Sequence, residues 1–240
     1  MPKPISILMY HSIESEPKGS VLRSLSVPKT LFKVQLYTLK LLGYKGLSMS
    51  ELTPYIEGKE NGKVFGITFD DGYLNNYENA LPVLKKLKYS ATCYIVADNI
   101  GGTNYWDHKL GVSTKQMMNH GHISNWLKSG MEIGSHSSTH LRLSKCDALE
   151  LKKEILGSKE KLENIFHTKV NHFCYPYGDF SKEVLDEVKK SKYTTATTVN
   201  RGRVNEKSIL YALPRVFVNH RTYPFNLLLK FFTSYEDRRG

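Results

Sequence analysis

The stretch VFGITFDDG, residues 64–72, is the part of the chain from which the fold can be worked out. Its first six residues form a short apolar run bounded by turn residues, which predicts a buried strand. The run ends at Asp70 and Asp71, so two adjacent carboxylates stand at the carboxyl end of that strand. Asp-Asp-Gly alone is a common turn sequence. Its meaning therefore depends on what the rest of the fold brings beside it.

Short apolar runs alternate with helical patterns along the chain. We expect strands at residues 5–10, 64–69, 91–96, 131–135, 170–175 and 194–198. We expect helices at residues 28–42, 77–87, 149–166 and 182–190. This alternation predicts an α/β fold with a parallel sheet covered by helices. Because functional side chains gather beyond the carboxyl ends of parallel strands, the aspartate pair, His136 and the turn after Cys174 should share one face.

A second motif, HSSTH at residues 136–140, follows the expected strand at 131–135. Two histidines four positions apart lie one turn apart on a helix or at the two ends of a tight loop. In both cases their imidazoles can converge on one metal ion, although isolated histidines at this spacing are often surface residues. One aspartate would complete a set of two imidazoles and one carboxylate. The neighbouring aspartate would then be free to accept a proton from water.

Composition indicates an ordinary globular chain. With 240 residues, 40% of them hydrophobic and 24% charged, we expect a single domain spanning residues 1–240. The formal net charge of +11 would attract anionic polymers or an anionic membrane surface, and it equally fits a soluble basic surface. No basic-aromatic motif supports nucleic-acid binding.

The cysteines and the chain ends exclude several classes of protein. Cys93, Cys146 and Cys174 are too few and too scattered for a disulfide framework. No apolar stretch approaches about 18 residues, so no membrane span is expected. We see no signal peptide, so we expect a cytoplasmic protein if the chain is complete, and a cell-envelope or secreted one if a signal was removed. The run FNLLLKFF at residues 225–232 predicts a packed terminal helix, with an interfacial membrane anchor as the alternative.

Three motifs together resemble those of the polysaccharide deacetylase family, also called the NodB-homology or carbohydrate esterase 4 family. They are TFDDG at residues 68–72, HSSTH at residues 136–140 and YPYG at residues 175–178. The resemblance covers roughly residues 5–220. It implies a distorted (β/α) barrel and metal-dependent hydrolysis of acetyl groups, usually from N-acetylated sugars.

The same resemblance implies roles for individual residues. Asp71, His136 and His140 are the expected metal ligands, and Asp70 is the expected catalytic base. The backbone N–H of Tyr175 is the expected second oxyanion donor. Zn²⁺ is the ion that such a ligand set favours, and Co²⁺, Ni²⁺ or Fe²⁺ would fit the same donors.

Two departures from the common family pattern carry further predictions. The usual Leu-x-His motif near the C-terminus has no convincing copy here. Instead MYHSI at residues 9–13 resembles the permuted biofilm-polysaccharide de-N-acetylase branch, so we predict that His11 is the general acid. His220 is the alternative acid, and a buried structural histidine is the alternative role for His11.

The second departure is Cys174, which stands where many family members have an arginine. Arg215 resembles the arginine after the last strand in the permuted branch. We therefore predict that it orients Asp70, with a surface arginine as the alternative.

The remaining expectations concern the substrate. We expect a lid or insertion at residues 98–130, with Trp106 stacking on a sugar ring and Tyr177 walling the site. The predicted substrate is an N-acetylhexosamine-containing polysaccharide, oligosaccharide or glycan precursor. The alternatives are an amide hydrolase acting on a ureide or a formyl-amino sugar, and an inactive glycan-binding protein. The sequence shows no loss of a ligand or of the base, which argues against the last.

Overall fold

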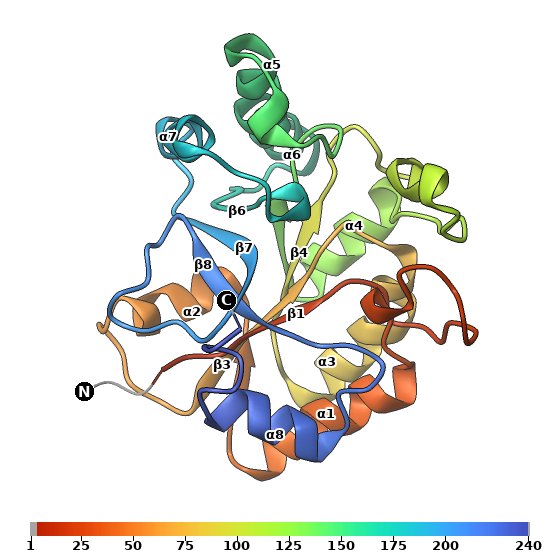
Figure 1. The fold of residues 1–240 in the computed structure, drawn as a ribbon, viewed down its shortest axis with the longest axis vertical. Coiled ribbons are helices and arrows are strands. Elements are labelled where there is room, and N and C mark those ends of the chain that lie inside the picture. The colour runs from red at the N-terminus through yellow and green to blue at the C-terminus, as the bar shows by residue number, and fades with distance from the viewer. Residues whose placement is uncertain (1–3, 240) are drawn as a thin grey trace.

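The computed structural model describes residues 4–239, which form a closed seven-strand parallel barrel surrounded by helices (Figure 1). Its strands follow the order β1-β8-β7-β6-β5-β4-β3, and pairing of β1 with β3 closes the barrel. Their bounds are β1 Ile7–Tyr10, β3 Val64–Phe69, β4 Thr92–Ile95, β5 Glu132–Ser135, β6 His172–Cys174, β7 Thr195–Arg201 and β8 Leu213–Phe217. A further strand, β2 Lys45–Leu47, pairs with the first half of β3.

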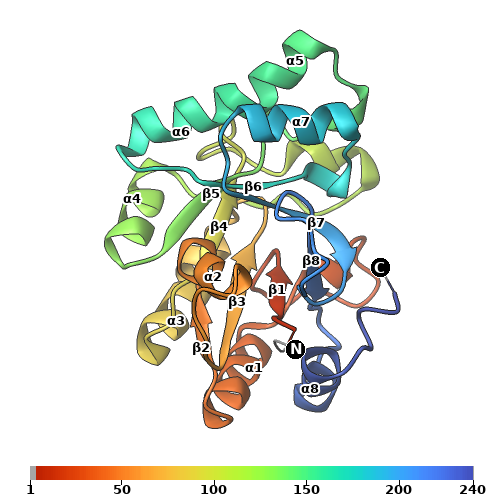
Figure 2. The same cartoon turned by 90° about the vertical axis from the view of Figure 1, so that its left-hand side faces the viewer.

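Helices pack around the outside of the barrel, and the connection between β7 and β8, which lies within the described residues, contains no helix. The figures show α5, α6 and α7 together on one side, and α1, α3 and α8 on the opposite side (Figures 1 and 2). The helix bounds are α1 Lys29–Leu41, α2 Met49–Ile56, α3 Leu81–Leu87, α4 His120–Lys128, α5 Ala148–Lys152, α6 Ser158–Phe166, α7 Lys182–Lys190 and α8 Pro224–Phe232. None of the helices within residues 4–239 has the length and apolar character needed to cross a bilayer.

The strand register brings distant residues to one face. Tyr10 on β1 pairs with Phe69 on β3, so the next residue of each strand, His11 and Asp70, emerges side by side. Because all barrel pairings are parallel, the carboxyl ends of the strands share this face. The segments that follow β5 and β6 therefore open onto the same face as the aspartate pair.

Close packing between strands fixes the position of β5. A Cβ atom on Gly134 would lie 2.5 Å from the Tyr94 ring on β4 and 2.8 Å from the His172 carbonyl oxygen on β6. Only glycine lets the three strands approach this closely. The end of β5, and with it His136, is thereby held at a defined place on the barrel rim.

The predicted α/β barrel is confirmed, and the expected strand at 64–69 and helix at 182–190 have the observed bounds. Sequence reasoning missed β8 as well as β2 and α2; β2 and α2 include Gly46 and Pro54, two residues that normally interrupt regular structure. The helix expected at 149–166 contains a π-helical turn at Lys153–Gly157. Within the stretch expected to be a lid or insertion, residues 120–128 form α4, which packs against β5.

Candidate active site

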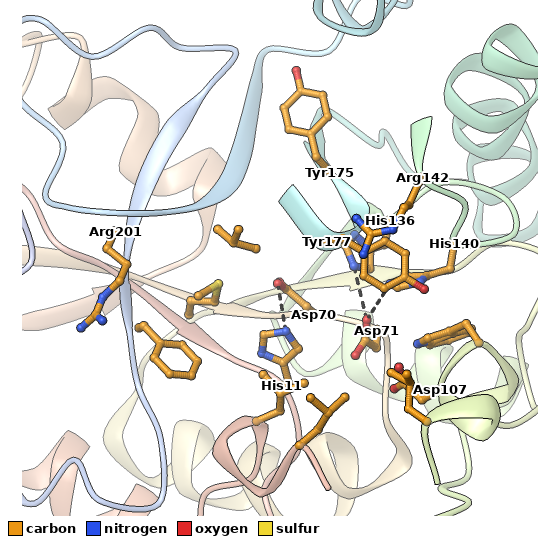
Figure 3. Close-up of a pocket in the computed structure, with 17 residues that line it drawn as sticks. His11, Asp70, Asp71, Asp107, His136, His140, Arg142, Tyr175, Tyr177 and Arg201 are labelled. Atoms are coloured by element: carbon orange, nitrogen blue, oxygen red, sulfur yellow. Dashed lines mark ion pairs between the residues drawn. The ribbon is translucent and has the colours of Figure 1, made fainter. Parts of the chain in front are cut away.

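A cavity of about 610 Å³ lies at the carboxyl ends of the barrel strands (Figure 3). Most of the side chains singled out in the sequence line it: His11, Asp70, Asp71, Trp106, His136, His140, Tyr175 and Tyr177. Arg215 is fully buried and reaches the site through its bonds to Asp70. His220, the alternative acid, is not among the lining residues.

Three predicted metal ligands converge in this cavity. The Nε2 atom of His136 lies 3.3 Å, and that of His140 3.4 Å, from the same carboxylate oxygen of Asp71. The three donor atoms all lie within 4.8 Å of one another, and all three side chains are buried. Burial alone would raise the pKa of Asp71, but hydrogen bonds from the two imidazoles outweigh it and hold the pKa well below its usual value. Asp71 is therefore an ionised acceptor facing two ring nitrogens.

The backbone around the aspartates separates their directions. Asp71 has φ 73° and Gly72 has φ 84°, so the chain turns through the left-handed region directly after β3. Asp is among the few non-glycine residues that adopt this conformation readily. The turn lets Asp71 face His136 and His140, while Asp70 remains on the side of His11 (Figure 3).

The segment carrying the two histidines is a tight loop, not a helix. Ser137 and His140 have φ 65° and 63°, and the His140 N–H donates to the Ser137 hydroxyl at 3.0 Å. The carboxylate of Glu154 accepts hydrogen bonds from the Ser138 N–H at 3.1 Å and the Thr139 N–H at 2.9 Å. It also accepts the Thr139 hydroxyl at 2.6 Å. Glu154 lies in the π-helical turn and is buried, so it anchors the loop from behind.

Each histidine ring is oriented by a different kind of contact. Nδ1 of His136 lies 2.8 Å from the Cys174 carbonyl oxygen, which can only accept, so Nδ1 carries a hydrogen and Nε2 is the nitrogen that faces Asp71. The His140 ring stacks on Trp106 with ring centres 4.4 Å apart. Tyr177 meets His140 edge-on at 4.6 Å. Trp106, expected to stack on a sugar, thus supports a predicted ligand with one of its faces.

The donor set fits a divalent metal ion. Two imidazole nitrogens and one carboxylate oxygen are the ligands of catalytic sites that leave a position open for substrate or water. Asp71, His136 and His140 would hold the ion. Asp70, His136 and Cys174 are also close enough to form a ligand group. That second set is less suited, because both oxygens of Asp70 are already bonded to Arg215.

Arg215 holds Asp70 through a paired contact. Its Nη1 and Nη2 atoms each donate to a different oxygen of Asp70, both at 2.7 Å, and its Nε donates to the Thr198 carbonyl at 2.8 Å. Burial would raise the pKa of Asp70, but the charge and hydrogen bonds of Arg215 hold it below its ordinary value. Nε2 of His11 lies 3.7 Å from Oδ2 of Asp70. The predicted base, acid and orienting arginine are therefore in one contact chain.

One expectation is not supported. The Tyr175 N–H was expected to face the reacting oxyanion, but it donates to the Thr197 carbonyl at 3.2 Å. The physical reason is that Tyr175 directly follows β6 and continues its hydrogen bonding with β7. The Tyr175 hydroxyl donates to the Tyr211 carbonyl at 2.8 Å. The tyrosine lines the cavity without a free donor at either group.

Sequence reasoning missed four residues of the site. Asp107 lines the cavity, and burial together with the charge of Asp71 raises its pKa to about 6. Arg142 lies over the Tyr177 ring at 4.4 Å, and Arg201 lines the far side of the cavity. Only Asp107 had a local signal, its place beside Trp106. Glu154 lies within the amphipathic helix expected at 149–166, where a single acidic residue is normally interpreted as a surface charge.

Comparisons with known proteins agree with this geometry. A family model described as polysaccharide deacetylase matches residues 57–196, more than half of the chain. YxkH of Bacillus subtilis (strain 168), which bears a polysaccharide deacetylase name, is 33% identical over 220 residues, covering 91% of this chain and 72% of the relative. The poly-beta-1,6-N-acetyl-D-glucosamine N-deacetylase of Staphylococcus epidermidis (strain ATCC 35984) is 27% identical over 231 residues, covering 91% of this chain and 76% of the relative.

A solved structure extends the likeness to the whole barrel. The Streptococcus pyogenes deacetylase PplD, solved in complex with acetate, aligns with a TM-score of 0.83 and 25% identity. The alignment covers 96% of this chain and 99% of that one. The structure thus has a barrel with an aspartate pair and two histidines at one end. The sequence matches the family model, and it aligns with a relative over most of that relative's length. The chain belongs to the polysaccharide deacetylase family.

Proposed function

We propose that this chain is a metal-dependent de-N-acetylase that removes acetyl groups from an N-acetylhexosamine-containing glycan. The observation that carries the proposal is that two adjacent carboxylates have different partners. Asp71 faces two imidazoles, whereas both carboxylate oxygens of Asp70 accept hydrogen bonds from Arg215. The staphylococcal relative is named for poly-beta-1,6-N-acetyl-D-glucosamine, which supports a glycan of this type as substrate.

Hydrolysis of an acetamide places four requirements on the site. An acetamide is a weak electrophile with a poor leaving group, so the water must be activated, the carbonyl polarised, the oxyanion stabilised and the nitrogen protonated. A divalent ion, when bound by Asp71, His136 and His140, polarises the carbonyl and acidifies water. The residues of the chain itself supply the proton transfers.

Asp70 accepts the proton of the attacking water. Arg215 keeps its carboxylate ionised and oriented, because the buried guanidinium opposes protonation and fixes both oxygens. The water oxygen forms a bond to the acetyl carbon, and the carbonyl electrons move onto oxygen. His11 in its protonated form then gives its proton to the amide nitrogen as the C–N bond breaks. Acetate and a free amine leave, and the proton on Asp70 can return to His11 through one water, because the 3.7 Å between the two groups is longer than a hydrogen bond.

The walls of the cavity suit a sugar ring. Trp106, Tyr177 and Phe217 give it flat apolar surfaces, and Asp107 and Arg142 add polar groups near the ligand set. Its volume of about 610 Å³ is in the range of small-molecule sites. We propose that Trp106 and Tyr177 contact the substrate through the faces and edges that His140 does not occupy.

The proposal is tested by acetate release from β-1,6-linked N-acetylglucosamine oligomers. We expect release that is abolished by a chelator, restored by Zn²⁺ and lost in Asp70→Asn. Release that persists in the chelator or in Asp70→Asn would contradict the mechanism. A parallel panel of a cyclic ureide and a formyl-amino sugar tests the substrate class, since preferential hydrolysis of either would move the assignment away from N-acetylated glycans.

A further inference from the structure

A second cavity of about 390 Å³ adjoins the first at the carboxyl ends of β7 and β8. The last residues of these strands, Arg201 and Phe217, line both cavities. Figure 3 shows Arg201 on the other side of Asp70 and His11 from the metal ligands, with its guanidinium directed away from them. A substrate longer than one sugar can therefore continue from the first cavity past Arg201 and Phe217.

The second cavity is basic. Four of its lining side chains are cationic: Arg201, Arg221, Lys230 and Arg239. No aspartate or glutamate lines it within the described part of the chain. Asparagine and threonine side chains complete the polar wall, and Phe217 and Tyr235 supply aromatic surface. This lining is unlike that of the first cavity, where three aspartates face the substrate space.

Two acids behind the wall, the buried Glu236 and the exposed Asp237, hold it in place. Glu236 is fully buried and accepts hydrogen bonds from Nε and Nη2 of Arg201 at 2.7 and 2.6 Å, and its carboxylate lies 3.2 Å from the Lys230 ammonium. The carboxylate of Asp237 binds Arg203 at 2.6 Å. These ion pairs fix the segment after α8, which contributes Tyr235 and Arg239 to the cavity.

The ion pairs leave positive charge uncompensated. One carboxylate, Glu236, serves two lining cations, Arg201 and Lys230. Among residues 4–239, no carboxylate oxygen lies within 4.0 Å of the guanidinium of Arg221 or of Arg239. The Arg239 guanidinium instead lies over the Tyr235 ring at 4.0 Å. Guanidinium groups bind phosphate and carboxylate through paired hydrogen bonds, so this arrangement favours an anion of that shape.

We propose that the second cavity is a subsite for an anionic group, a phosphate or a carboxylate, carried by the same glycan whose N-acetylhexosamine occupies the first cavity. This inference rests on the proposed function and adds the charge of the substrate to it. Arg221 and Arg239 contact the anion, and Arg201 marks the boundary between the two subsites. The enzyme then selects N-acetylated glycans that bear negative charge near the acetylated residue.

The test compares three forms of one N-acetylglucosamine tetramer: neutral, oxidised to the aldonic acid at its reducing end, and phosphorylated there. For the intact chain loaded with Zn²⁺, kcat/KM for the anionic forms should exceed that for the neutral form by about tenfold, as expected for two exposed ion pairs. The preference should shrink between about 50 mM and about 500 mM NaCl as the charges are screened. Preference for both anions indicates a general anion subsite, and preference for the phosphate alone assigns phosphate as its ligand.

The double variant Arg221→Gln, Arg239→Gln should lose this preference, measured as the ratio of anionic to neutral kcat/KM. The matched control is Lys45→Gln, Lys85→Gln, which removes the same charge from residues lining a different cavity. The control should keep the wild-type ratio. Equal turnover of all three substrates by the wild-type chain, or equal loss of the ratio in both double variants, would overturn the subsite while leaving de-N-acetylation intact. Absence of acetate release from every substrate would instead count against the proposed function.

Discussion

Nη1 and Nη2 of Arg215 donate to the two carboxylate oxygens of Asp70, at 2.7 Å each. The neighbouring aspartate, Asp71, faces His136 and His140 instead. Two adjacent aspartates are thus given different surroundings by one buried arginine and a left-handed turn at Asp71. The positive charge of Arg215 balances the negative charge of the ionised Asp70, and the paired hydrogen bonds fix the plane of the carboxylate. This contact explains how one of the two acids can stay off the metal ligand set.

We predict that Arg215→Lys lowers kcat by roughly a hundredfold, because a single ammonium cannot hold both oxygens of Asp70 and the base loses its alignment. Steady-state acetate release measures the loss, and circular dichroism checks that the variant is folded. Arg203→Lys is the control, since Nε and Nη2 of Arg203 donate to the two oxygens of Asp237, at 3.3 and 2.6 Å, away from the first cavity. An Arg215→Lys enzyme with wild-type kcat would show that this orientation does not matter.

We predict that His11→Ala lowers kcat by about a hundredfold or more, since the leaving nitrogen loses its proton donor. His220→Ala should be close to wild type, because His220 lies outside the lining of the first cavity. Both variants are measured with the same N-acetylglucosamine oligomer at saturating concentration. The reverse result, with activity lost in His220→Ala and kept in His11→Ala, would transfer the role of general acid to His220.

The local parts of this site could be predicted from the sequence. Asp70 and Asp71 follow an apolar strand, and His136 follows another, so alternation and strand-end placement predicted one face for all three. The guanidinium of Arg215 comes from β8, which the alternation pattern did not predict as a strand, and it was found only through the family resemblance. Its bond to Asp70 joins residues 145 positions apart, and such a contact leaves no local signal.

The rest depended on tertiary packing. Glu154 looked like one more charge on an amphipathic helix, yet the π-helical turn places it, buried, behind the histidine loop. The family resemblance assigns the Tyr175 N–H to the oxyanion, but in the structure this N–H continues the β6–β7 pairing. The sequence predicts that Trp106 stacks on a sugar ring, and in the structure one face of its ring already stacks on His140.

We predict that Glu154, which is not itself a metal ligand, affects metal affinity by holding the loop that carries two of the ligands. Glu154→Gln removes the charge that holds the backbone of Ser138 and Thr139, so the His136–His140 spacing should loosen. We expect Zn²⁺ affinity to fall by about tenfold, measured by competition with a fluorescent chelator. Glu160→Gln, an exposed acid on α6, is the control. Unchanged Zn²⁺ affinity in Glu154→Gln would mean that the loop holds its shape without this anchor.

The Glu236 ion pairs predict a dependence of stability on pH. Burial would raise the pKa of Glu236, but the hydrogen bonds and charges of Arg201 and Lys230 hold it below its ordinary value of 4.5. The stabilisation is therefore fully present above about pH 4.5 and is lost as the pH falls through the lower folded pKa. At neutral pH, Glu236→Gln should lower the free energy of unfolding by about 2 kcal/mol, the size of a hydrogen bond to a charged group.

Urea unfolding at a series of pH values checks this dependence. The difference between wild type and Glu236→Gln should be constant near neutrality and shrink below about pH 4.5. Glu206→Gln, at an exposed position, should match wild type throughout. A difference that stays constant down to strong acid would show that the carboxylate charge of Glu236 is not what stabilises the segment after α8.

The central claim is that Asp71, His136 and His140 bind a metal ion while Asp70 stays free of it. Its most direct test is the metal content, by elemental analysis, of Zn²⁺-loaded and desalted wild type, Asp71→Asn and Asp70→Asn. We predict stoichiometric zinc in wild type and in Asp70→Asn, and little in Asp71→Asn. Zinc retained in Asp71→Asn, or lost in Asp70→Asn, would contradict the assignment.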